Sequence, residues 1–224
     1  QTAKDMDESE NKGVLFLDEL PEFSRTALET LRQPLEDRQI TISRAKYTST
    51  LPCSFMLVAS MNPCPCGYYN DPHHACTCSP AQVQRYMSKI SGPLLDRIDI
   101  QIEVAPVSVS ELAHAPKGES SADIRQRVVA ARAIQTERYK DEPGVHCNAQ
   151  MSRSMLECHA RLDDEASATL SRAMKRLDLS ARAYDRILKV ARTIADLAAS
   201  PDIRSEHIKE AIGYRNLDRA GWGE

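Results

Sequence analysis

The stretch GVLFLDELPEF, residues 13–23, decides the fold expected for this chain. Its apolar block, residues 14–17, is too short for a helix on its own and is typical of a strand buried on both faces. Asp18 and Glu19 follow that block directly, at the carboxyl end of the predicted strand. In open α/β sheets this edge binds ligands, so two adjacent acids there can hold a cation or orient a water molecule. A solvated turn is the alternative, and the stretch taken alone favours that turn.

The composition indicates a globular protein of one large or two small domains. The chain has 224 residues, of which 42% are hydrophobic and 27% charged, with a formal net charge of −3. Apolar runs all fall short of the roughly 18 residues that a membrane helix needs, and the first residues are polar rather than signal-like. We therefore expect a cytoplasmic protein with no membrane partner. Any contact with nucleic acid must be local, because the chain has no overall positive charge.

Four of the seven cysteines lie within fifteen residues of one another, namely Cys64, Cys66, Cys76 and Cys78. Without a secretion signal, such clustering indicates a metal rather than disulfides. The C-x-C spacing is tighter than the usual C-x-x-C, but four thiolates on one short loop can form a closed, structural Zn²⁺ site. His73 and His74 are alternative ligands, and reduced free thiols are the alternative to a metal. Cys53, Cys147 and Cys158 are expected to be packing residues.

The first half of the chain alternates between the periods of helices and strands. A helix is predicted over residues 24–38, with Ser24 as N-cap and a kink at Pro34, followed by a β-hairpin over residues 39–52 with Arg44 and Lys46 near its tip. A second buried strand over residues 55–59 leads to Asn62, a helix starts after Ser79 and runs towards Ser91, and residues 99–104 alternate as a third strand. Strands separated by helices indicate an α/β fold with a parallel sheet.

The second half reads as helical. The segment AHAPKGESS, residues 113–121, is the best candidate for a boundary, and residues 123–139 follow with helical periodicity. Four more helices are predicted over residues 152–161, 164–177, 180–199 and 204–214, with Ser152, Ser180 and Ser205 as N-caps. The last 80 or so residues therefore resemble a small helical bundle.

Several segments together resemble one family. GVLFLDELPEF resembles the Walker B segment of AAA+ ATPases, and the hairpin, the strand before Asn62, LLDRID and SARAYDRILKVARTIADL follow in the order of magnesium-chelatase-like ATPases. The runs ISRAKYTSTLPCSFMLVASMNPCPCGYY and SGPLLDRIDI are similar to the competence-associated YifB/ComM group, and the resemblance extends from Gly13 to Trp222. It implies a partial AAA+ core over residues 1–106, a linker and helix over 107–147, and an all-helical lid over 148–224.

The resemblance also implies a nucleotide site for ATP and Mg²⁺. Asp18 would bind Mg²⁺ through water, and Glu19 would polarise the water that attacks the γ-phosphate. Asn62 matches the sensor 1 position, where an amide can donate to phosphate and accept from water. An Asn-Pro turn is the alternative for Asn62.

Three further cationic positions take roles from the family. Arg97 matches the arginine finger that enters the neighbouring subunit's site, and a local ion pair with Asp96 or Asp99 is its alternative. Arg182 matches the sensor 2 arginine. It lies in the first turn of its helix, where the dipole disfavours a cation by about 0.3–1 kcal/mol and a docked phosphate would reverse that penalty. A solvated side chain is the alternative.

Arg44 and Lys46 match the hairpin that grips DNA in the channel of related hexameric helicases. Two cations per subunit would be twelve in a hexamer, enough for strongly salt-dependent binding. An exposed hairpin protected by charge is the alternative.

The resemblance breaks at the P-loop, G-x-x-x-x-G-K-[ST], because none of the eight glycines precedes a lysine. The family places that loop upstream of Walker B, so we expect this chain to be the carboxyl-terminal part of a longer protein. The absent strand would lie between two strands that are present, so we expect the isolated chain to bind ATP poorly and its sheet to rearrange or pair with another copy. Three functions follow: a hexameric ATP-driven DNA helicase or branch-migration motor, a chelatase-type ATPase that remodels a protein, and a non-enzymatic module stabilised by zinc.

Overall fold

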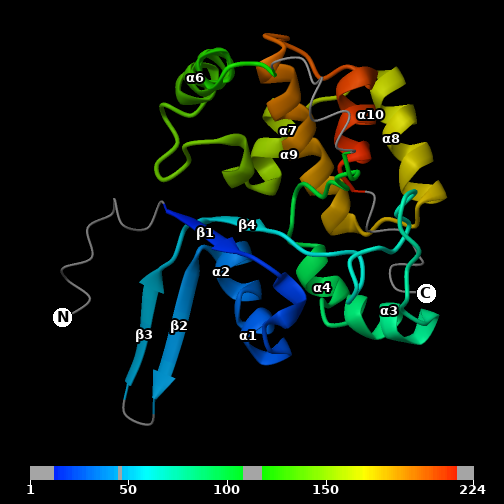
Figure 1. The fold of residues 1–224 in the computed structure, drawn as a ribbon. Coiled ribbons are helices and arrows are strands. Elements are labelled where there is room, and N and C mark those ends of the chain that lie inside the picture. The colour runs from blue at the N-terminus through cyan, green and yellow to red at the C-terminus, as the bar shows by residue number, and fades with distance from the viewer. Residues whose placement is uncertain (1–12, 45–46, 108–117, 216–224) are drawn as a thin grey trace. The chain divides into compact units, whose positions relative to one another are not determined.

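The computed structural model describes residues 13–44, 47–107 and 118–215. These residues form two compact units that divide between Ile98 and Asp99 (Figure 1). The first unit holds a small parallel sheet, a hairpin and short helices, and the second is helical, so the chain is of the mixed α/β class. In the part of the chain that is described, every helix is too short or too polar to cross a membrane.

The sheet of the first unit has two strands, β1 (Val14–Leu17) and β4 (Met56–Ala59). They pair in parallel from Val14 opposite Met56 to Leu17 opposite Ala59, which confirms the predicted parallel pairing. The predicted burial on both faces is wrong. Alternate residues of the two strands form one face that is 40–60% exposed, namely Val14, Phe16, Met56 and Val58. Only the opposite face, to which Leu17 belongs, packs against a core, because no described element covers the first.

The predicted hairpin is confirmed by the antiparallel strands β2 (Gln39–Arg44) and β3 (Tyr47–Pro52). Hydroxyl groups face one another across it, with 3.2 Å between Thr41 and Thr50 and 3.0 Å between Ser43 and Thr48. Cross-strand hydroxyl pairs of this kind help to fix the register of a hairpin that lacks a strong turn signal.

The helix predicted over residues 24–38 is split into α1 (Arg25–Thr30) and α2 (Arg32–Asp37). Ser24 caps it as predicted, since its hydroxyl accepts the Ala27 N–H at 3.2 Å. The break occurs at Leu31 because Pro34 has no N–H to offer the Thr30 carbonyl. Both helices contribute to a core with a 3₁₀ turn, η2 (Leu20–Glu22), and the short helix α4 (Gly92–Leu95). The buried residues of that core are Leu20, Leu28, Ile90, Leu94 and Leu95.

Helix α3 (Pro80–Met87) begins at Ser79 as predicted and ends before Ser91. The Ser79 hydroxyl accepts the Gln82 N–H at 3.3 Å, and the Gln82 side chain accepts the Ser79 N–H at 2.8 Å. Such a reciprocal capping box satisfies two N–H groups at once.

The predicted third strand over residues 99–104 is wrong, because within it only Gln101 makes a β-bridge, to Arg215. Ile100, Ile102 and Val104 are 53–81% exposed. A strand needs a hydrogen-bonded neighbour. The resemblance would place this segment beside the strand that carries the P-loop, a motif absent from these 224 residues.

The described residues of the second unit form these helices and one 3₁₀ turn: α6 (Ser121–Arg138), η3 (Asn148–Gln150), α7 (Arg153–His159), α8 (Asp164–Arg176), α9 (Ala181–Leu197) and α10 (Ser205–Gly213). All five predicted helices are present. The predicted caps Ser152 and Ser180 are confirmed, whereas α10 is capped at Arg204 instead of Ser205, because the His207 ring accepts the Arg204 N–H at 3.0 Å. Of the predicted boundary segment, residues 113–117 lie outside the described residues, and its last residue already belongs to α6.

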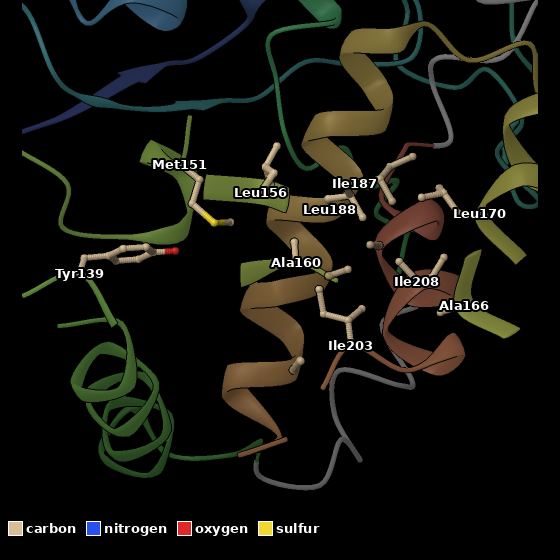
Figure 2. Packing of buried hydrophobic residues seen from close by; sticks show 13 residues of the cluster. Tyr139, Met151, Leu156, Ala160, Ala166, Leu170, Ile187, Leu188, Ile203 and Ile208 are labelled. Carbon is tan, nitrogen blue, oxygen red and sulfur yellow. The ribbon is translucent and has the colours of Figure 1, made fainter. Parts of the chain in front are cut away.

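Helix α9 forms the centre of the second unit (Figure 2). Its buried apolar positions lie along one face, as expected for an amphipathic helix, and those from Ile187 to Ala195 share a core with residues of α7, α8 and α10. They are Ala183, Ile187, Leu188, Ala191 and Ala195. This core is separate from that of the first unit, and each unit therefore has its own apolar interior.

Candidate functional site

Asp18 lies at the carboxyl edge of the parallel pair. There the first residue after β1 lies next to the first residue after β4. Asp18 Oδ1 accepts a hydrogen bond from the Glu19 N–H at 3.0 Å and a short one from the Ser60 hydroxyl. Ser60 is itself fixed, because its N–H donates to the Leu17 carbonyl at 3.0 Å. The carboxylate is therefore held in one orientation by two donors from two different strand ends.

Ser60 was missed by the sequence reasoning, which took Asn62 as the polar residue at the end of β4. The signal lay in the register: Leu17 pairs with Ala59, so the next residues, Asp18 and Ser60, are neighbours. Without the register, which depends on the three-dimensional pairing, a lone serine after a strand has no distinguishing feature.

Glu19 has left-handed backbone angles, φ 51° and ψ 53°, which are uncommon for a residue with a side chain. This conformation costs a residue with a Cβ about 1–2 kcal/mol. It is held by the Glu22 N–H, which donates to the Glu19 carbonyl at 2.8 Å, and by the Leu20 N–H, which donates to the Ser60 carbonyl at 2.9 Å. Glu19 and the preceding Asp18 are both exposed.

The two acids suit a hard cation. Mg²⁺ prefers oxygen ligands and retains several waters, so it is bound through one or two carboxylates at an accessible edge. The hydrogen bonds to Asp18 use Oδ1, and none from the described residues occupies Oδ2. The donor set therefore fits a hydrated Mg²⁺ ion.

Asn62 is exposed and lies three residues after β4. Its backbone is tied to α3, because the Asn62 N–H donates a hydrogen bond to the Tyr86 hydroxyl. Burial raises the pKa of Tyr86, the carboxylates of Glu22 and Glu19 raise it further, and the hydrogen bond from Asn62 acts in the opposite direction. Tyr86 therefore interacts electrostatically with Glu19 and is hydrogen-bonded to the backbone of Asn62.

Arg97 follows α4 and is engaged within its own subunit. Its side chain is only 9% exposed, its Nε lies 2.8 Å from Glu36 Oε2, and its Nη1 donates to the Pro93 carbonyl at 2.6 Å. The angle at Nε falls outside hydrogen-bond geometry, so this contact is an ion pair only. The predicted alternative for Arg97 was an ion pair with Asp96 or Asp99. Here Glu36 is its partner, and Asp99 pairs with Arg186 of α9.

Arg182 lies where the sequence places it, exposed in the first turn of α9 after the cap Ser180, whose hydroxyl accepts the Ala183 N–H at 3.1 Å. It belongs to the second unit, whereas Asp18, Glu19, Asn62 and Arg97 belong to the first. Of the two hairpin cations, Arg44 is the last residue of β2 and pairs with Tyr47. Lys46 lies outside the described residues.

The four clustered cysteines come together in the loop between β4 and α3. Their sulfur atoms all lie within 4.8 Å of one another, an arrangement that can hold a metal ion. Backbone N–H groups of Tyr68 and Thr77 lower the pKa of Cys66 to about 5, whereas burial raises the pKa of Cys78 to about 12. The alternative ligand His74 is directed elsewhere: its ring lies 4.9 Å from the Tyr68 ring and its Nδ1 lies 3.4 Å from Asp71 Oδ1.

Comparison with known proteins gives consistent matches along the chain. The family described as "Magnesium chelatase, subunit ChlI" matches residues 8–112, and that described as "Magnesium chelatase, subunit ChlI C-terminal" matches residues 118–215. Competence protein ComM of Haemophilus influenzae is 46% identical over 208 residues, and the uncharacterized protein YifB of Escherichia coli is 44% identical over 211 residues. These alignments cover 92% and 93% of this chain but only 40% of each relative.

Proposed function

The chain belongs to the magnesium-chelatase-like YifB/ComM family, and we propose that it is the part of an ATP-hydrolysing AAA+ motor that carries the magnesium-binding and water-activating acids. The observation that carries this proposal is the pair Asp18 and Glu19 at the carboxyl edge of two parallel strands, with Asp18 held by Ser60. Ligands of α/β sheets bind at that edge.

Each residue of the edge has a distinct role in the proposal. Asp18 would hold a hydrated Mg²⁺ ion, and Glu19 would orient the attacking water and accept its proton. When bound, the Mg²⁺ ion neutralises charge that develops on the phosphates. Asn62 would contact the γ-phosphate and the attacking water, Arg182 would bind phosphate as part of a helical lid, and Arg97 would act on the nucleotide of a neighbouring subunit.

The phosphate cradle must come from polypeptide outside these 224 residues, which span about 40% of the length of the relatives. Backbone N–H groups and a P-loop lysine bind the phosphates in such enzymes, and no Gly-Lys pair occurs in the sequence. The cofactors proposed for the complete protein are ATP and Mg²⁺, with a structural Zn²⁺ at the four cysteines.

DNA is the proposed substrate of the motor, and a homohexamer its working form. The name of the Haemophilus relative, a competence protein, supports a role as a helicase or branch-migration factor in natural transformation and recombination. The hairpin of β2 and β3 supports it independently, since Arg44 is the last residue of β2 and Lys46 precedes β3 in the sequence.

The test measures ATP turnover by the full-length protein that contains this chain, with and without single-stranded or branched DNA. We expect hydrolysis stimulated by DNA, and a loss of about 10²–10⁴-fold on Glu19→Gln because the water loses its base. Glu22→Gln is the matched control, since it removes the same charge three residues away. DNA-stimulated turnover that survives Glu19→Gln would refute the assignment.

Remodelling of a protein partner is the second candidate, supported by the family description as a subunit of magnesium chelatase. It predicts Glu19-dependent hydrolysis that is indifferent to DNA. An absence of hydrolysis in the full-length protein would favour the third possibility, a non-enzymatic interaction module stabilised by zinc.

A further inference from the structure

The sulfur atoms of the four-cysteine cluster are spaced for a shared metal ion. Cys64 Sγ lies 3.4 Å from Cys66 Sγ and 3.7 Å from Cys76 Sγ, and the latter two are 3.5 Å apart. A disulfide would need about 2.05 Å. Four sulfurs bound to zinc at about 2.3 Å in a tetrahedron lie about 3.8 Å from one another. The observed separations are therefore much closer to a four-thiolate zinc site than to any disulfide.

The loop is folded so as to bring the two C-x-C pairs together. Gly67 has φ +83° and its N–H donates to the Cys64 carbonyl at 3.0 Å, which forms a tight turn around the first pair. This backbone conformation favours glycine. Between the pairs, Asp71 Oδ1 accepts the N–H groups of His73 and His74 at 2.7 and 2.9 Å. These two local turns bring the second C-x-C pair close to the first.

Four protein ligands would leave no open position on the metal, which is the mark of a structural site. Cys64 is fully buried and the other three cysteines are partly buried. Residues 60–78 contain no helix or strand although all of them are described. An ordered loop of this length needs a stabilising element of its own.

The cluster also provides the surface on which α3 packs. The buried face of α3, Val83, Tyr86 and Met87, contacts Cys64, and only Met61 and the other three cysteines complete this small core. So few apolar side chains give limited stabilisation, and small cores of this kind commonly depend on a metal.

We propose that Cys64, Cys66, Cys76 and Cys78 bind one zinc ion in a closed site that anchors α3, so that Tyr86 holds the backbone of Asn62 in place. Tyr86 is the link, because it contacts the cluster on one side and accepts the Asn62 N–H through its hydroxyl. Tyr86 is then a positioning residue. The role of Asn62 in ATP hydrolysis rests on the proposed ATPase function, whereas the metal site does not.

The first test measures the zinc content of the purified chain by mass spectrometry, after dialysis against a weak chelator. We expect about one zinc per chain, reduced at least tenfold in the double variant Cys66→Ser, Cys76→Ser, and unchanged in the control Cys147→Ser, Cys158→Ser. Replacing zinc by Co²⁺ should give the absorption of a tetrahedral thiolate site. Wild-type chain without zinc, or zinc retained equally by the two double variants, would overturn the proposal.

The second test follows amide hydrogen exchange at residues 60–64 by mass spectrometry, which needs no nucleotide and no activity. Removal of zinc from the wild type should speed exchange there at least tenfold, reversibly, while the helices of the second unit stay unchanged. Tyr86→Phe should keep the zinc but speed exchange at Asn62. If exchange at Asn62 is indifferent to zinc or to Tyr86→Phe, the anchoring role is wrong. Because neither readout involves ATP, failure of the ATPase proposal would leave both results intact.

Discussion

Glu19 has an unfavourable backbone conformation, and its side chain has the central role in the proposed hydrolysis. Its left-handed angles are held by hydrogen bonds of the turn rather than by its own preference. Strain at a residue with a functional side chain is typical of active sites, where position matters more than stability. A more permissive residue at this position should therefore gain stability and lose function.

Glu19→Gly is expected to raise the free energy of unfolding by about 0.5–1 kcal/mol, because glycine adopts positive φ without a Cβ clash but loses more entropy on folding. The same change should abolish ATP hydrolysis by the full-length protein. Urea denaturation and turnover measure the two effects. Arg38→Gly is the control, since Arg38 also has a positive φ of 53° but lies away from the acids. Loss of hydrolysis in both variants would argue against a specific role of Glu19.

At the scale of elements, a buried polar network joins α6, η3 and α9 in the second unit. Arg138 Nη1 donates to Asp196 Oδ2 at 2.7 Å and to Asn148 Oδ1 at 2.8 Å, Asn148 Nδ2 donates to the same Asp196 oxygen at 2.8 Å, and Arg192 Nε donates to Asp196 Oδ1 at 3.1 Å. Burial acts to raise the pKa of Asp196, but the hydrogen bonds from Arg138 and Asn148 outweigh it and lower the pKa overall.

Asp196→Asn should lower the free energy of unfolding by about 3–5 kcal/mol at pH 7, because it leaves the buried Arg192 and the partly buried Arg138 without a counter-charge. The stabilisation by Asp196 is complete above its unfolded pKa of about 3.9 and is lost as the pH falls through its lower folded value. Wild type should therefore lose stability below about pH 4, and the variant less steeply. Circular dichroism during urea unfolding at several pH values measures this. The exposed control Asp141→Asn should change little, and an equal loss in it would contradict the network.

The hairpin is the other element with a testable property. Replacing Arg44 and Lys46 by alanine in the full-length protein should weaken binding of single-stranded DNA. It should also reduce the slope of log K against log salt by about 1.4 per chain, since each phosphate contact contributes about 0.7. Fluorescence anisotropy across a salt series measures the slope. Lys140→Ala, on an exposed turn outside the hairpin, should leave it unchanged, and an unchanged slope in the hairpin variant would exclude this grip.

Local chemistry made some elements predictable and long-range pairing made others unpredictable. Ser24, Ser79, Ser152 and Ser180 cap helices as predicted because a cap depends on residues within one turn. The strand at residues 99–104 and the contact between Ser60 and Asp18 depend on which strands lie side by side, information that one sequence does not hold. The family resemblance predicts the order of the motifs. The contact between Ser60 and Asp18 follows only from the register of β1 and β4.

At the scale of the whole molecule, the proposed function needs a phosphate cradle, and no Gly-Lys pair of a P-loop occurs in these 224 residues. The 224-residue chain alone should bind ATP with a Kd above about 1 mM, since hydrated Mg²⁺ at two carboxylates gives little affinity without P-loop amides. Isothermal titration calorimetry with MgATP measures this, and the full-length protein serves as the positive control. Submillimolar affinity of the isolated chain would show that the cradle is not needed.

Under the proposal that Arg97 acts on a neighbour's nucleotide, its ion pair with Glu36 would couple nucleotide binding to assembly. An arginine that must reach a neighbour's nucleotide has first to leave Glu36 and its nearly buried place, so reaching across carries a fixed cost in each subunit. Nucleotide binding that favours this exchange of partners would also strengthen the contact between subunits. By linkage, a formed contact would raise the nucleotide affinity by the same factor. Under the same proposal, a local ion pair would set the threshold at which single subunits and a working ring interconvert.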